Sequence, residues 1–152
     1  MTDIHLEVDI KCPPETVFDT LADIVHYDRW LAPSGTYNTT TDVSDSTVRA
    51  GTTYVDRNSG GALYGQVREY KPYSRLVFHQ ATKRKIIGLD VTIRYELTRT
   101  DEGTHLERTT SMTPLGLMRL VGPIVIGRTR NENQRTLEEL KYYLEEGKAA
   151  RI

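Results

Sequence analysis

Hydrophobic and polar positions alternate over the first segment of the chain. In residues 3–11 every second side chain, from Ile4 to Ile10, is apolar, which is the two-residue period of a β-strand with one buried face. Apolar residues then recur every three or four positions over residues 14–25. This spacing predicts an amphipathic helix, and residues 27–31 resemble a second short helical turn.

The middle of the chain predicts six further strands, because apolar runs alternate with turn-forming Gly, Pro, Asn and Ser. Their ranges are 36–48, 51–57, 62–70, 75–83, 89–99 and 104–112. Short turns make consecutive strands antiparallel. We expect the Thr-rich first strand of this group to lie near a sheet edge.

The last section, about 115–147, carries apolar residues at helical spacing. Gly122-Pro123 should bend this helix or delay its regular part, because proline lacks the backbone donor that a helix interior needs. The element order predicts an α+β fold, in which a seven-stranded curved antiparallel sheet follows one face of the long helix. Where sheet and helix diverge, a concave space is the natural place for a ligand.

Length and charge narrow the class of protein. The chain has 152 residues and a formal net charge of −1, so we expect a single domain over 1–152 and no nucleic-acid partner. The basic groups at 83–85 and at Arg128, Arg130 and Arg135 are interpreted as solvated faces. The one cysteine, Cys12, cannot form an internal disulfide. Without a membrane span or a signal peptide, we expect a soluble cytoplasmic protein.

Several segments resemble a known family. Residues 8–23 contain the pattern P-x-E-x-V-F-x-x-L-A-D, and Trp30 follows shortly after. This opening resembles that of the START-like, or SRPBCC, helix-grip superfamily, and within it the polyketide cyclase/dehydrase and lipid-transport group. Segments 67–78, 95–106 and 133–145 match in the same order. The resemblance implies a helix-grip fold with two short helices after the first strand, and a cavity for a hydrophobic ligand.

Strand alternation predicts the side chains that face the helix and could contact a ligand. Together with positions on the short and long helices, the candidate ligand-binding residues are Trp30, Tyr54, Val67, Phe78, Gln80, Ile93, Tyr95, Arg108, Thr110, Met118, Val125, Thr129 and Asn133. An inward Arg108 is costly in a dry core. It either orients an anionic or carbonyl group of a ligand, or reaches solvent from a strand end.

Three functions remain open. The first is binding of a small hydrophobic or amphipathic molecule, such as a lipid or polyketide. The second is polyketide cyclase or dehydratase chemistry, with Arg108 and Tyr54 as the candidate catalytic residues that polarise a carbonyl group. The third is a protein-interaction module. We expect no cofactor and no metal, since His5, His79 and His105 fall on outward faces. Ligand identity and oligomeric state stay open.

Overall fold

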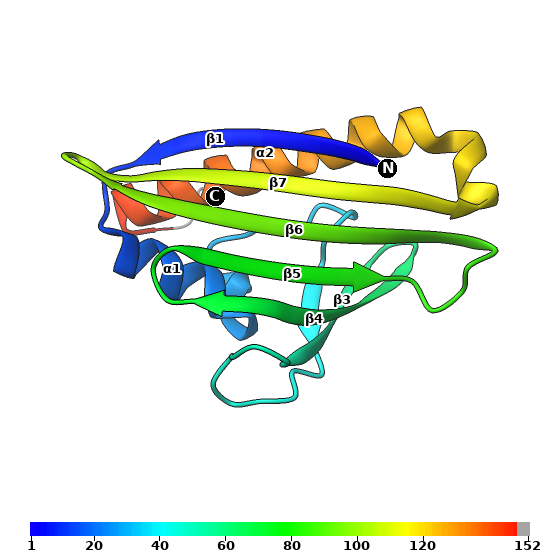
Figure 1. Cartoon of the computed structure of the whole chain (residues 1–152), viewed down its shortest axis with the longest axis horizontal. Coiled ribbons are helices and arrows are strands. Elements are labelled where there is room, and N and C mark those ends of the chain that lie inside the picture. Colours follow the sequence, from blue (N-terminus) through cyan, green and yellow to red (C-terminus); the bar gives the residue numbers. More distant parts are fainter. Residues whose placement is uncertain (149–152) are drawn as a thin grey trace.

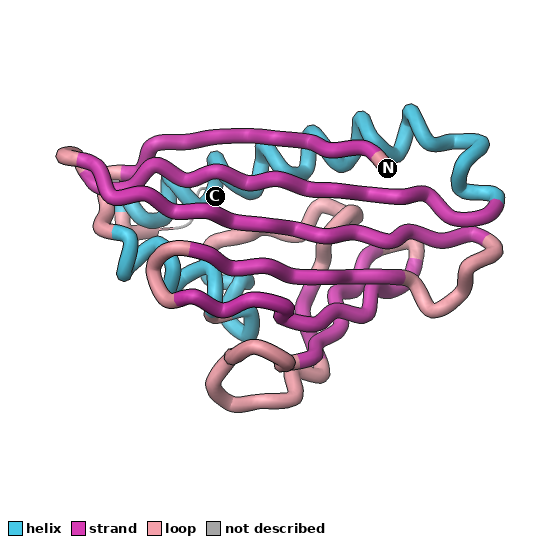
Figure 2. Tube along the Cα trace, viewed as in Figure 1, coloured by secondary structure: helices cyan, strands magenta, loops and turns pink. Residues whose placement is uncertain are grey.

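A seven-stranded antiparallel sheet and a long helix dominate the structure, a computed structural model that describes residues 1–148 (Figures 1 and 2). The elements in chain order are β1 (Thr2–Ile10), α1 (Pro14–Ala22), η1 (Ile24–Arg29), β2 (Thr39–Thr41), β3 (Thr53–Asn58), β4 (Gly61–Lys71), β5 (Arg75–Ala81), β6 (Ile87–Thr100), β7 (Gly103–Gly116), η2 (Leu117–Val121) and α2 (Gly122–Glu146). The elements η1 and η2 are short 3-10 helices. The predicted helix-grip architecture is therefore confirmed.

The sheet order is β1-β7-β6-β5-β4-β3-β2, so only β1 leaves the simple meander and pairs with the last strand. The β6–β7 hairpin is the longest pairing, from Ile87 opposite Gly116 to Thr100 opposite Gly103. Helix α2 runs along the β1–β7 side of the sheet, while α1 lies at the end of the sheet that carries the β4–β5 turn, to the left in Figure 1. Within residues 1–148, no helix is both long and apolar enough to cross a bilayer.

The predicted strand over 36–48 was too long, although its edge position was right. Only Thr39–Thr41 pairs with a neighbour, and it forms the edge strand β2. Asp42 has a left-handed backbone (φ 53°), which ends the extended conformation. Asp45 then organises the following loop, because its carboxylate accepts hydrogen bonds from Arg49 and from the Thr52 hydroxyl.

The last section is not helical from residue 115 onward, but the expectation that Gly122-Pro123 delays the regular helix is confirmed. Strand β7 continues to Gly116, whose left-handed backbone (φ 58°) turns the chain into η2, and α2 begins at Gly122. Pro114 is tolerated in β7 because β1 pairs no further than Met112, so one side of β7 is open there. Pro123 lies in the first turn of α2, where a missing N–H costs nothing.

The predicted helix over 14–25 is also shorter, since α1 ends at Ala22 and η1 follows. The main core lies between α1, the inner face of the sheet and the second half of α2. Its fully buried members include Phe18, Leu21, Leu76, Leu106 and Leu140. A smaller apolar group of Ile4, Val91 and Met112 lies nearer the start of α2. The two groups leave a space between them.

Candidate functional site

A cavity of about 190 Å³ lies between the inner face of the sheet, η1 and α2. Its apolar wall includes Ile24, Leu31, Leu63, Phe78, Leu89, Val91, Ile93 and Met112. Its polar wall includes Tyr27, Tyr37, Thr40, Tyr54, Asp56, Gln80, Tyr95, Arg108, Thr110, Thr129, Glu132, Asn133 and Thr136. The lining also contains the exposed residue Thr36, so the cavity reaches the surface near that position.

Arg108 is the cation of this cavity, and only 8% of it is exposed. Its guanidinium donates to the Tyr95 hydroxyl and, at 2.8 Å, to Asn133 Oδ1. Asn133 in turn donates to the Thr110 hydroxyl at 2.9 Å. No carboxylate forms an ion pair with Arg108 within the described chain, and its Nε is buried without an acceptor. A buried donor without an acceptor is costly.

The structure excludes one of the two alternatives for Arg108. Solvent does not satisfy this side chain, because it sits in the interior of β7 and Asn133 of α2 contacts it from across the cavity. The strand-end interpretation was therefore wrong. Arg108 instead projects into the space between sheet and helix, where a bound acceptor could reach it.

Asp56 on β3 is an acidic residue of the same cavity, which Glu132 of α2 also lines. Its carboxylate accepts hydrogen bonds from Gln80 Nε2 at 2.7 Å and from the Thr40 hydroxyl at 2.6 Å. Burial raises the pKa of Asp56 to about 6, although these hydrogen bonds and the charge of Arg108 partly oppose the shift. A carboxyl group with this pKa exchanges protons near neutral pH.

Tyr54 lies beside Asp56 and shares the same donor. Gln80 Nε2 donates to the Tyr54 hydroxyl at 2.9 Å. Since that hydroxyl makes no other hydrogen bond among residues 1–148, its proton is available to a ligand. Burial raises the pKa of both Tyr54 and Tyr95, so both phenols stay protonated at neutral pH.

Hydrogen bonds hold the loop after η1 against α2 at the edge of the cavity. Arg135 bridges Glu132 and Glu139 on the helix and also donates to the Ala32 carbonyl at 2.7 Å. The Ser34 hydroxyl donates to Glu132 at 2.9 Å. Arg135 therefore belongs to an ordered network, and the expected solvated face was wrong for this residue. The network fixes one wall of the cavity opening.

The structure brings nine of the candidate ligand-binding residues to the cavity. They are Tyr54, Phe78, Gln80, Ile93, Tyr95, Arg108, Thr110, Thr129 and Asn133. Four others lie elsewhere. Trp30 and Val67 are buried in the main core, Val125 packs against the smaller apolar group, and Met118 sits on η2 outside the cavity.

Sequence reasoning missed Asp56 and the tyrosines of the loops. A signal for Asp56 was present, because it lies two positions after Tyr54 on the same strand and so shares its face. Tyr27 and Tyr37 come from η1 and the segment before β2. Irregular segments have no hydrophobic repeat that predicts the direction of a side chain. The position of these two tyrosines at the cavity therefore follows only from the tertiary structure.

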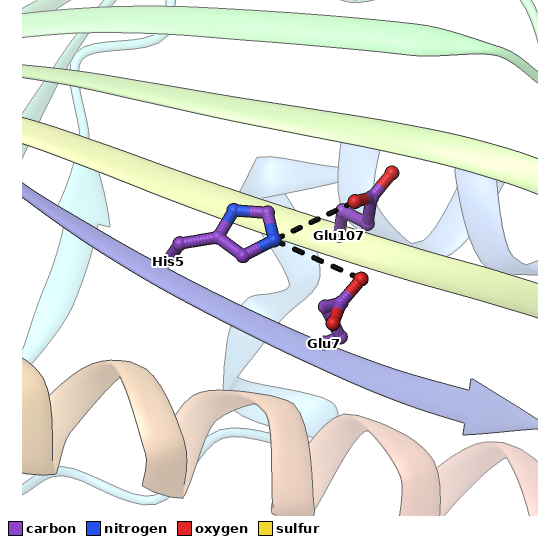
Figure 3. Close-up of side chains that lie close together, drawn as sticks. All are labelled: His5, Glu7 and Glu107. Atoms are coloured by element: carbon purple, nitrogen blue, oxygen red, sulfur yellow. Dashed lines mark ion pairs between the residues drawn. The ribbon is translucent and has the colours of Figure 1, made fainter.

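A second cluster of titratable groups lies on the outer face of the sheet (Figure 3). His5 Nε2 is 3.8 Å from Glu7 and 3.5 Å from Glu107, and His105 Nε2 is 3.1 Å from Glu7. A hydrogen bond from His105 lowers the pKa of Glu7, and bonds to Asp9 and Glu7 raise that of His105. His5, Glu7 and Glu107 place possible metal ligands within 4.8 Å of one another.

The sequence prediction of no metal site did not anticipate this grouping, although Glu7 follows His5 by two positions. In this structure the side chains satisfy one another as ion pairs. They are partly exposed, by between 36% and 50%, and lie on the face opposite the cavity. We therefore treat the cluster as a surface ion-pair network.

The fold and the cavity define a helix-grip protein, and comparison with known families agrees. Residues 1–145 match the family described as polyketide cyclase / dehydrase and lipid transport. The chain belongs to this family. No curated protein matches the sequence.

Solved structures share the fold at low sequence identity. Protein MLL2253 from Mesorhizobium loti is 19% identical, with a TM-score of 0.74 over 95% of this chain and 98% of that one. The Aha1 dimer from Colwellia psychrerythraea is 21% identical, with a TM-score of 0.73 over 97% and 98%. DynU16, a putative protein in the dynemicin biosynthetic locus, is 18% identical, with a TM-score of 0.71 over 99% of this chain and 49% of that one.

Proposed function

We propose that the protein binds a small amphipathic molecule in the cavity, with its apolar part against the sheet and an anionic or carbonyl oxygen at Arg108. The observation that carries this proposal is the buried Nε of Arg108, which has no acceptor among the described residues. A ligand oxygen would supply that acceptor. Membership of a family that includes lipid transport supports the same class of ligand.

The cavity volume limits the size of the ligand. A cavity of about 150 Å³ lined by apolar side chains accepts a benzene molecule, and the space here is about 190 Å³. We therefore expect one aromatic ring or a short acyl chain with a polar head, unless the loop before β2 moves outward. An interior left open in this way also supports ligand binding over a protein-interaction module, which needs no cavity.

The test uses aromatic and medium-chain carboxylic acids, each with its matched hydrocarbon, in thermal shift and isothermal titration. We expect the acids to bind and Arg108→Met to weaken their binding at least tenfold, because a charged hydrogen bond is lost. Arg94→Met is the matched control, since Arg94 lies on the neighbouring strand and is exposed. Equal binding of acids by both variants would contradict the proposal.

A second candidate function is acid–base catalysis on a ketone, and Asp56 favours it. Its pKa of about 6 suits a group that removes a proton at neutral pH. The Asp56 carboxylate would take the proton from the carbon next to a carbonyl. Arg108 and Tyr54 would donate hydrogen bonds to the resulting enolate oxygen.

Deuterium uptake by an aryl methyl ketone in heavy water tests this candidate by nuclear magnetic resonance. The wild-type protein should accelerate uptake at the methyl group, and Asp56→Asn should abolish the acceleration while the ketone still binds. Glu107→Gln, on the outer face, is the control and should retain full activity. Uptake no faster than in buffer would exclude this chemistry for simple ketones.

A further inference from the structure

One end of the molecule exposes an unusual number of large apolar side chains. We call these six residues the end patch: Ile86, Ile87, Leu117, Leu120, Val121 and Ile124. They make up six of the eleven exposed large hydrophobic residues in the described chain. Leu120 is 81% exposed and Ile86 is 74% exposed, so neither contributes to the core.

The end patch joins two segments that are distant in sequence. The loop between β5 and β6 meets η2, because Leu117 N donates to the Ile86 carbonyl at 2.6 Å and Ile87 pairs with Gly116. Figure 1 shows the β5–β6 loop and the turn from β7 into α2 at the same end of the molecule, to the right. The exposed apolar residues therefore lie at one end of the molecule, on segments that contact each other.

Basic residues accompany these apolar residues within 82–89 and 113–131, without any acid among them. Six exposed basic residues lie in the two segments: Lys83, Arg84, Lys85, Arg119, Arg128 and Arg130. No Asp or Glu occurs in residues 82–89 or 113–131. None of the six cations forms an ion pair with another part of residues 1–148. Since the net charge of the chain is −1, this end is positive and the remainder is negative.

We propose that the end patch docks the protein on a membrane surface that contains anionic phospholipid. Apolar side chains that project beside clustered Lys and Arg are the features that hold proteins at bilayer interfaces. The apolar tips would enter the boundary between headgroups and acyl chains, while the cations contact lipid phosphates. A nucleic acid would use the cations but would leave the exposed aliphatic tips in water.

The docked end also lies close to the cavity. Leu89 lines the cavity and stands two residues beyond Ile87 on β6, and Thr129 lines it from the first half of α2. Docking would therefore bring the cavity near the bilayer. The proposal does not depend on a cavity ligand, because the binding tested below needs only the surface residues.

The experiment is cosedimentation of the full chain with vesicles of phosphatidylcholine alone and with vesicles that also contain phosphatidylglycerol. We expect binding only to the anionic vesicles, and weaker binding as the salt concentration rises. Neutralising Lys83, Arg84 and Lys85 to Gln should lower partitioning about a hundredfold, at roughly fivefold per cation. The matched control changes Lys11, Arg29 and Lys71 to Gln, three exposed cations at the opposite end, and should reduce it far less.

The double variant Ile86→Ser and Leu120→Ser separates insertion from charge alone. Because both side chains are largely exposed, the variant should keep its melting temperature and lose vesicle binding at least tenfold. Unchanged vesicle binding would overturn the proposal and indicate a general polyanion site, which binding to duplex DNA would then reveal. Absence of vesicle binding, with a dimer in light scattering that the double variant abolishes, would overturn it in favour of a second copy.

Discussion

Glu107 and Arg108 are adjacent on β7, have opposite charges and lie on opposite faces of the sheet. Glu107 faces outward, where His5 and Glu7 on β1 lie beside it in partial contact with water. Arg108 faces inward, where it is held by the neutral partners Tyr95 and Asn133. The outer face thus carries many charged neighbours, whereas the cavity wall surrounds one cation with uncharged hydrogen-bonding groups.

The two faces stabilise a charged side chain in different ways. A charge on the outer face is stabilised by water whether or not its partners are present, so its ion pairs add little to stability. A buried cation has no such alternative, and each neutral acceptor around it matters. Substitutions in the cavity wall should therefore destabilise the protein more than substitutions on the outer face. The cavity wall also retains an unused hydrogen-bond donor, Arg108 Nε.

The largest effect should follow from Asn133→Leu. This change removes an acceptor from Arg108 and a donor to Thr110, so we expect a loss of about 3 kcal/mol in the free energy of unfolding. Glu107→Gln, the outer-face counterpart, should change it by less than about 0.5 kcal/mol. Urea unfolding measures both variants. Similar losses for the two would remove the distinction between the faces.

The next effect concerns the pH dependence caused by Asp56. Because its folded pKa of about 6 exceeds the unfolded value near 4, the folded state holds the extra proton, and stability falls as pH rises between these values. The difference amounts to about 2 to 3 kcal/mol. Asp56→Asn should therefore be more stable relative to wild type at pH 7 than at pH 4. Parallel stability profiles would show that Asp56 is not perturbed.

A third effect links the two charged groups of the cavity. The positive charge of Arg108 lowers the pKa of Asp56 and so opposes the effect of burial. Arg108→Met should raise the pKa of Asp56 further, as measured by carbon-13 shifts of its carboxyl group during titration. Arg94→Met, on the outer face, should leave the titration unchanged. A shift of equal size in this control would indicate a general effect of net charge.

The smallest effect lies on the outer face at His105. Hydrogen bonds to Asp9 and Glu7 raise its pKa, so its stabilising contribution is complete below pH about 6.5 and is lost as pH rises through the raised value. His105→Gln should therefore lower stability slightly at pH 6, by no more than about 0.5 kcal/mol, and not at pH 9. Thermal unfolding at the two pH values measures this difference.

Strand alternation predicted which face of the sheet each residue occupies but not its position along that face. Val67 and Phe78 are cross-strand partners and both point inward. Only Phe78 reaches the cavity, whereas other side chains of the main core fill the space around Val67. That filling depends on how the helices cross the sheet, which no local period encodes.

The candidate site shows the same limit. Arg108, Thr110 and Tyr95 could be predicted because their strands have clear alternation on both sides. Asp56 could have been predicted from Tyr54, whereas its raised pKa depends on burial by segments distant in sequence. Gly122-Pro123 indicated where the regular helix begins, but apolar spacing did not, because the apolar residues that precede α2 are exposed in the end patch and do not form the buried face of a helix.

Helix α2 is buried unevenly along its 25 residues. Apart from Gly122 at its start, its buried positions all lie between Asn133 and Leu140, while most of the turns from Pro123 to Arg130 are open to solvent. Because local unfolding follows local packing, backbone amides of residues 124–130 should exchange hydrogen much faster than those of 136–142. The cavity could then open by loosening of two helical turns, at a small fraction of the free energy of global unfolding.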